Sequence, residues 1–214
     1  MTYPDRKQCY KYLEDYKTPE HVVGHCKSVA AVGYAIAKAL NEAGGTRAVP
    51  IEHLHYRNYV QTDPDKELDN GEWRKFDLDL ILAAGLLHDM ARVEERHWDV
   101  CADFCEEKGQ HQLGKAIRQH MKYKYTNDVN HLTEVDMLSL GDRLSLEDHY
   151  AGLDDRMDYI IRKAEKRGDS GARERILAKK KETRKLLDDI EARIGCSIDE
   201  LMAGLNYDNV EGED

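Results

Sequence analysis

The segment that most constrains the fold is residues 76–89, FDLDLILAAGLLHD. Its apolar residues follow one another almost without a break, and a helix that is apolar all round is buried. A buried strand is the competing interpretation, but the Ala-rich composition and the helical patterns on both sides favour a helix. The apolar run stops at His88 and Asp89. Because a carboxylate beside a packed core costs free energy unless it is paired or bound to a metal, this helix end is a candidate functional site.

Helical patterns account for most of the remaining chain. Thr18 and Pro19 are typical of a helix start, and the helix that they open stops near Gly44. Thr133 and Ser197 each open a capping box. Only 7% of the residues are aromatic while 35% are charged, a balance that favours helices with solvated faces, and no convincing strand is present. The sequence therefore predicts an all-α fold, with helices at residues 4–16, 19–43, 76–89, 95–107, 111–121, 133–144, 153–167, 171–194 and after 197.

Residues 46–75 differ from their surroundings and form a loop-rich insertion. They contain two prolines and an Asn-Gly pair, and we expect at most a short helix near 51–60. Two roles stay open for this insertion: part of a substrate cleft, or a peripheral loop that only connects two helices. The first role is suggested by side chains of the types that grip a base or a phosphate, namely Tyr56, Arg57, Tyr59 and Trp73.

Charge and cysteine content exclude several classes of partner. The formal net charge is −10, and an acidic surface repels phosphate backbones, so we do not expect binding to long nucleic acid. A small phosphorylated ligand is still compatible, because a bound metal can reverse the local field. No apolar run approaches the length of a membrane span. Five cysteines, an odd number, and no signal peptide favour a cytoplasmic protein without a disulfide framework, in which Cys101 and Cys105 are buried small residues.

Further histidines and an aspartate fall at core-facing points of other predicted helices. His25 shares a helix face with Val29, His120 ends the predicted helix 111–121, and Asp142 lies on a turn flanked by leucines. His97 begins the helix that follows the His-Asp pair. Imidazole and carboxylate ligands together suit borderline divalent metals such as Fe, Mn, Co or Zn. The sequence therefore suggests a metal centre assembled from several helices.

These residues resemble the motifs of the HD-domain metal-dependent phosphohydrolases. In that family, metal ligands are a His on an early helix, a His-Asp pair that ends a buried helix, and an Asp on a later helix. The matching segments are HVVGHCKSVA, AAGLLHDMAR and LSLGDRLSLED, and the resemblance covers about residues 18–165. A two-metal subgroup adds two histidines between the pair and the last Asp. The ligands that the resemblance implies here are His25, His88, Asp89, His97, His120 and Asp142.

The resemblance also implies a fold, an activity and cofactors. We expect an HD helical bundle over residues 1–170, including the insertion, and a helical extension with an acidic tail over 171–214. One or two divalent ions (Fe, Mn, Co, Zn or Mg) would activate a hydroxide that cleaves a phosphomonoester or phosphoanhydride of a nucleotide or another small phosphorylated metabolite. Asp89 would be catalytic, and Arg92 and Arg143 would offset charge on the phosphoryl oxygens.

Two other functions stay open for the same ligand set. A mixed-valent di-iron pair on this fold can activate oxygen, which would make the protein an oxygenase. A non-catalytic module that only binds a nucleotide would normally have lost ligands, and none of the six is lost here. The family often has Gly-Lys after the His-Asp pair, whereas this chain has Ala91-Arg92, so the substrate is left open.

Overall fold

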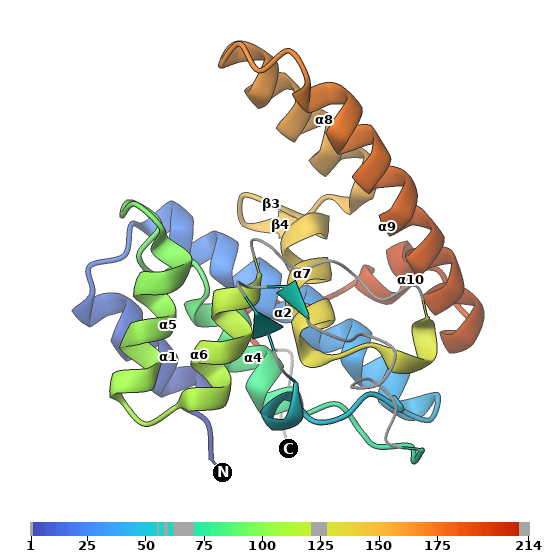
Figure 1. The fold of residues 1–214 in the computed structure, drawn as a ribbon, viewed down its shortest axis with the longest axis horizontal. Coiled ribbons are helices and arrows are strands. Elements are labelled where there is room, and N and C mark those ends of the chain that lie inside the picture. The colour runs from blue at the N-terminus through green and yellow to red at the C-terminus, as the bar shows by residue number, and fades with distance from the viewer. Residues whose placement is uncertain (1, 55, 58–59, 62–70, 121–127, 210–214) are drawn as a thin grey trace.

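The computed structural model describes residues 2–54, 56–57, 60–61, 71–120 and 128–209, and confirms the all-α class. The helices are α1 (Arg6–Asp15), α2 (Glu20–Glu42), α4 (Leu78–Leu87), α5 (His97–Glu107), α6 (His111–Gln119), α7 (Glu134–Leu144), α8 (Gly152–Lys166), α9 (Ala172–Ile194) and α10 (Ile198–Met202), with 3-10 turns at Ile51–His53 and Val129–His131. Figure 1 shows α2 and α4 inside the bundle and the α8–α9 pair extending from it.

The expectation of no strands was wrong in two places. Antiparallel hairpins join β1 (Tyr56–Arg57) to β2 (Val60–Gln61) and β3 (Ser145–Leu146) to β4 (His149–Tyr150). Each strand has two residues, which is too short to show the alternating pattern by which a strand is recognised in a sequence. The β3–β4 hairpin follows α7 directly and turns through Glu147, whose φ is 54°.

Side-chain caps fix where the helices that carry the candidate site begin. Asp77 Oδ1 accepts a hydrogen bond from Leu80 N at 3.0 Å and starts α4. Thr133 and Asp136 form the expected capping box at the start of α7. These caps satisfy backbone N–H groups that would otherwise lack a partner in a buried helix end. The directions of α4 and α7, and therefore the positions of their last turns, follow from the local sequence.

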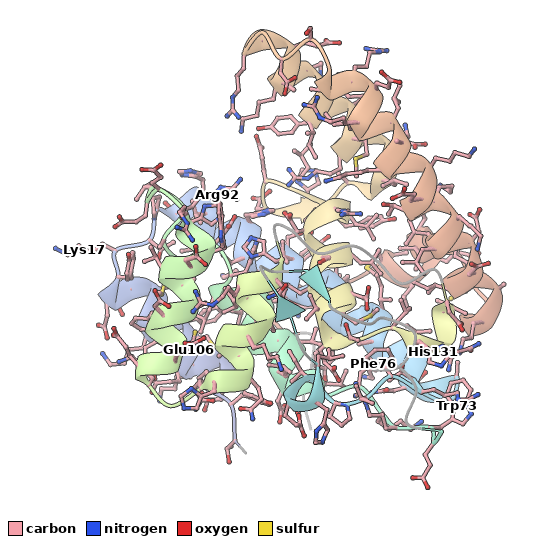
Figure 2. The ribbon with its side chains drawn as sticks, in the orientation of Figure 1. Lys17, Trp73, Phe76, Arg92, Glu106 and His131 are labelled. Atoms are coloured by element: carbon pink, nitrogen blue, oxygen red, sulfur yellow. The ribbon has the colours of Figure 1, made fainter. Side chains whose placement is uncertain are left out.

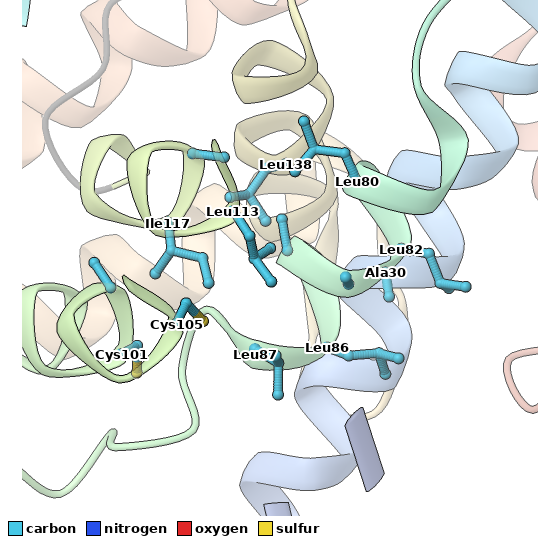
Figure 3. Close-up of a cluster of buried hydrophobic side chains, with 14 of the residues drawn as sticks. Ala30, Leu80, Leu82, Leu86, Leu87, Cys101, Cys105, Leu113, Ile117 and Leu138 are labelled. Carbon is cyan, nitrogen blue, oxygen red and sulfur yellow. The ribbon is translucent and has the colours of Figure 1, made fainter. Parts of the chain in front are cut away.

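Helix α2 packs closely against both α4 and α7 because glycines face it. A Cβ atom at Gly85 would lie 2.7 Å from Ala30 Cβ, and one at Gly141 would lie 3.2 Å from Val29 Cγ1. Both distances are shorter than the 3.5–4.0 Å, roughly, of an ordinary carbon contact. The apolar cluster between these helices also takes side chains from α5 and α6, among them the buried Cys101 (Figure 3).

A second apolar cluster connects the C-terminal helices to the same central helix. Ile36 and Leu40 of α2 pack with Leu187 and Ile190 of α9 and with Met202 of α10. The helices expected to form a C-terminal extension thus share a core with α2. Among the described residues, no helix combines the length and the apolar composition that a membrane span requires.

The described part of the insertion is fastened to the body of the protein. Thr46 pairs with Arg74 in an isolated β-bridge, and the Arg74 guanidinium binds the Glu134 carboxylate at the start of α7 with an Nη1–Oε1 distance of 2.6 Å. The Trp73 ring lies against the Arg193 guanidinium, 4.8 Å from ring centroid to Cζ. Figure 2 shows Trp73 at the opposite end of the molecule from Arg92. The side chains of Tyr56, Arg57 and Tyr59 lie outside the described residues.

Candidate metal centre

The six candidate ligands reach one place from five helices. His25 comes from the second turn of α2, and His97 is the first residue of α5. His88 and His120 are the C-cap residues of α4 and α6. The end of α4 therefore presents His88 and the following Asp89 where α2, α5 and α6 also meet. Asp142 comes from the last turns of α7.

The Asp89 carboxylate lies at the centre of this cluster, with a different oxygen facing each side. Asp89 Oδ2 is 3.8 Å from His25 Nε2 and 3.6 Å from His88 Nε2. Asp89 Oδ1 is 3.0 Å from His97 Nε2 and 3.8 Å from His120 Nε2. Two groups of ligand atoms that could hold a metal result: His25, His88 and Asp89, and Asp89, His97 and His120.

Asp142 lies beside the first group. Its Oδ1 atom is 3.2 Å from His25 Nε2 and accepts a hydrogen bond from Arg156 Nη2 at 3.1 Å. Burial alone would raise the pKa of Asp142, but His25 and Arg156 lower that pKa below its usual range. The carboxylate is thus charged and within reach of the first group.

Two of the histidine rings are oriented by backbone carbonyls. His88 Nδ1 donates to Gly85 O at 2.8 Å, and His120 Nδ1 donates to Ile117 O at 2.7 Å. A ring that donates through Nδ1 keeps its Nε2 lone pair free for a metal. The Nε2 atoms of both rings point at Asp89, so the helix ends themselves set the tautomer that a metal ligand needs.

The buried polar atoms of this cluster fit a metal. The Nε2 atoms of His88 and His120 are buried and have no hydrogen-bond partner among the described residues, and the buried His97 Nε2 and Asp89 Oδ1 face each other at 3.0 Å. Leaving such atoms unpaired costs about 1–3 kcal/mol each, more when the group is charged. Divalent ions would satisfy all four atoms at once, because imidazole nitrogen and carboxylate oxygen are common ligands of Fe, Mn, Co and Zn.

The protonation states also suit metal binding. Burial lowers the pKa of His88 to about 4 and lowers the pKa of His120 below its usual value. Burial alone would raise the pKa of Asp89, but the neighbouring His88, His97 and Arg92 hold it well below its usual value. Near neutral pH the His88 and His120 imidazoles are therefore neutral and the Asp89 carboxylate is ionised, which are the forms that bind metal ions.

The structure places the two arginines that the sequence suggested in different surroundings. Arg92 Nη1 donates to Asp89 Oδ2 at 2.6 Å, and its side chain is 43% exposed beside the centre. Arg143 instead donates to Thr183 Oγ1 on α9 at 3.1 Å and is not among the described residues that line the cavity. Sequence reasoning missed Arg156, the arginine that contacts the candidate ligand Asp142.

An ionic cluster joins the two helices that carry His97 and His120. The guanidinium of Arg118 on α6 donates to three carboxylates of α5: Asp99 at 3.1 Å, Asp103 at 2.6 Å and Glu106 at 3.1 Å. Arg118 precedes His120 by two residues, and Asp99 follows His97 by two residues. The cluster therefore fixes α5 against α6 next to the two histidines.

A cavity of about 960 Å³ opens beside the centre and includes His25, Asp89 and Arg92 in its lining. Its other walls come from the first turns of α2, the β3–β4 turn, one face of α8 and the C-terminal segment. The α8 face consists of Arg156, Tyr159 and Lys163, spaced i, i+3 and i+7 in a predicted helix, and that spacing was the available signal for them. None of the described residues of the insertion lines this cavity.

Comparison with known proteins identifies the family. A family model described as the HD domain matches residues 22–203, which is most of the chain. No curated protein and no solved structure matches the chain. The matched segment contains all six candidate ligands and the two groups that could hold a metal. The chain belongs to the HD domain family, a superfamily of metal-dependent hydrolases whose members bind divalent metals.

Proposed function

We propose that this protein is a phosphohydrolase that uses two divalent ions to cleave a small phosphorylated metabolite. The observation that carries the proposal is the position of Asp89, which turns one carboxylate oxygen toward each of two histidine groups. A carboxylate in that position can bridge two ions. His25, His88 and Asp142 would complete one site, and His97 and His120 the other. Bound there, divalent ions would lower the pKa of a coordinated water and supply hydroxide near neutral pH.

The residues around the centre have separate tasks in this proposal. Arg92 is partly exposed to the cavity and can offset negative charge on the phosphoryl oxygens while it holds Asp89 in place. Arg156 is a positioning residue, because its guanidinium binds the candidate ligand Asp142 and would act on the metal site through that carboxylate. The carbonyl groups of Gly85 and Ile117 hold the His88 and His120 rings in orientation throughout the reaction.

The size of the cavity favours a substrate larger than inorganic phosphate. A volume of about 960 Å³ lies within the range of cavities that hold ligands of drug or nucleotide size. The cavity lining combines cationic side chains of α8 with the Tyr159 ring. A phosphate ester of a nucleoside-sized or sugar-sized group would fill it.

The test measures metal content and phosphate release together. Metal-loaded protein should contain about two ions per chain and release phosphate from at least one compound in a panel of nucleotides and sugar phosphates. Asp89→Ala should lose both properties, because it removes the shared carboxylate. Asp79→Asn, an exposed acid on the same helix, is the matched control and should retain both. Oxygen consumption without phosphate release would instead identify an oxygenase, and two bound ions without either reaction would identify a non-catalytic module.

A further inference from the structure

One wall of the cavity lies outside the segment that the HD domain model matches. The match ends at residue 203, whereas Tyr207 and Asp208 line the cavity. These two residues follow α10, and Asp208 lies beside Lys27 of α2. The surface that a substrate would meet therefore includes residues beyond the matched segment. We call residues 205–209 the C-terminal wall.

Hydrogen bonds to three other parts of the chain hold the C-terminal wall in position. Tyr150 N of β4 donates to Tyr207 Oη at 3.0 Å, and Arg6 Nη1 of α1 donates to Tyr207 O at 3.4 Å. Lys27 Nζ of α2 donates to Asp208 Oδ1 at 2.8 Å. Within the wall, Asn206 Oδ1 accepts from the backbone N–H groups of residues 208 and 209. The wall is thus anchored on both sides of Asp208.

The charges of the cavity give Asp208 a specific task. Three cations that line the cavity are each paired with a carboxylate: Arg92 with Asp89, Arg156 with Asp142, and Lys27 with Asp208. The first two carboxylates belong to the metal centre, whereas Asp208 does not. Its hydrogen bond raises the pKa of Lys27 and its charge neutralises the ammonium group. Lys163, a fourth cation of the lining, instead donates to Tyr159 Oη at 3.3 Å. A substrate therefore meets little uncompensated positive charge beside Lys27, on the side of the C-terminal wall.

We propose that the C-terminal wall is a specificity determinant, in which Asp208 neutralises Lys27 and so disfavours substrates that place a second anionic group beside Lys27. The inference deepens the proposed function and rests on it for the location of the phosphoryl group. The substrate class that follows is the phosphomonoester of a neutral or hydroxyl-bearing group. Compounds that carry a carboxylate or a second phosphate near the ester are disfavoured.

Binding of two phosphonates of nearly equal shape tests this wall without any turnover. 2-Carbamoylethylphosphonate and 2-carboxyethylphosphonate differ by one negative charge, and their C–P bonds are not substrates of a phosphohydrolase. Calorimetric Kd values on the Mn-loaded protein give the ratio of the two affinities. Asp208→Asn leaves Lys27 unpaired and should shift the ratio about two- to five-fold toward the carboxylate compound, as expected for one charge at this range in a solvated site. Lys27→Gln leaves Asp208 unpaired and should shift the ratio in the opposite direction.

The controls separate this charge effect from other causes. Asp189→Asn makes the same change of net charge in the exposed Lys185–Asp189 pair of α9 and should leave the ratio unchanged. The double variant of residues 27 and 208 should return close to the original ratio. Equal affinity ratios for Asp208→Asn and Asp189→Asn would overturn the inference. Shifts of the same sign from Asp208→Asn and Lys27→Gln, or no binding of either phosphonate, would also overturn it. If the expected shifts occur in a protein that releases no phosphate, the charge selectivity of the C-terminal wall is supported and the proposed phosphohydrolase reaction is rejected.

Discussion

Replacing Gly85 by Ala should damage the stability of the fold and the metal centre together. The new methyl group would lie 2.7 Å from Ala30 Cβ and 2.8 Å from Ala30 N, and both neighbours are buried in the contact between α2 and α4. Separating these helices by about 1 Å would restore ordinary contacts. Overpacking of this kind costs about 1–3 kcal/mol, and the higher helix propensity of Ala returns up to about 1 kcal/mol. We expect a net loss of about 2 kcal/mol, or about 4–8 °C in Tm for a chain of this length.

The same separation should move His25 on α2 away from Asp89 at the end of α4. Thermal unfolding of the variant measures the loss of stability, and metal titration measures the change at the centre. The affinity for the ion beside His25 and His88 should fall about ten-fold, as for other changes that disturb ligand orientation. Gly171→Ala at the start of α9 is the matched control, because the nearest atom there is Nη1 at the end of the exposed Arg175 side chain, which can move aside. A Gly85→Ala protein that melts within about 1 °C of the original, with the same metal affinity, would refute the close-packing argument.

Three further predictions concern the ligands and their supports. His97→Ala should lower metal content from about two ions per chain toward one, as measured by elemental analysis of metal-loaded protein, and an unchanged content would show that His97 is not a ligand. Arg118→Met should cost about 1–2 kcal/mol of unfolding free energy, because it removes three hydrogen bonds to carboxylates in a partly exposed cluster. It should also weaken binding of the ion beside His97 and His120 more than binding of the other ion, and equal weakening of both in a titration would contradict this. Stability of the metal-free protein should fall as pH drops from about 6.5 to about 4. In this range His88 takes up a proton in the unfolded chain but not in the folded protein, where its pKa is lowered to about 4. His88→Gln should reduce this dependence of Tm on pH, and an unchanged dependence would assign it to other groups.

Local patterns were enough to predict the helices, and together with the resemblance to the HD family they predicted the position of the centre. The apolar run before His88 predicts a buried helix because no face of it can be solvated, and the capping residues Thr133 and Ser197 predict where later helices start. The structure brings the six candidate ligands together because each lies at a core-facing point or an end of its helix. Periodicity indicates such positions, but the choice of these six residues as ligands came from the resemblance to the HD family.

The cavity could not be predicted in the same way. Arg143 follows the candidate ligand Asp142 in the sequence, but neighbours on a helix point about 100° apart, and Arg143 binds Thr183 of α9. Arg156 reaches Asp142 from another helix, and only the packing of α8 against α7 reveals that contact. Tyr207 lies even farther from the motif residues in the sequence, and it lines the cavity only because the C-terminal segment folds back beside it. Two-residue strands were missed because they have no pattern of their own.

The shared carboxylate of Asp89 has a thermodynamic consequence for metal loading. If each oxygen of one side chain binds a different ion, the two binding events are coupled, and the coupling free energy is the same whichever ion binds first. The first ion would fix the carboxylate in the orientation that the second needs, while its charge would oppose the second. Measured dissociation constants would then belong to the pair rather than to either group of histidines. A substitution on one side, such as His120→Ala, would change the affinity on the other side through Asp89, although no atom there had been altered.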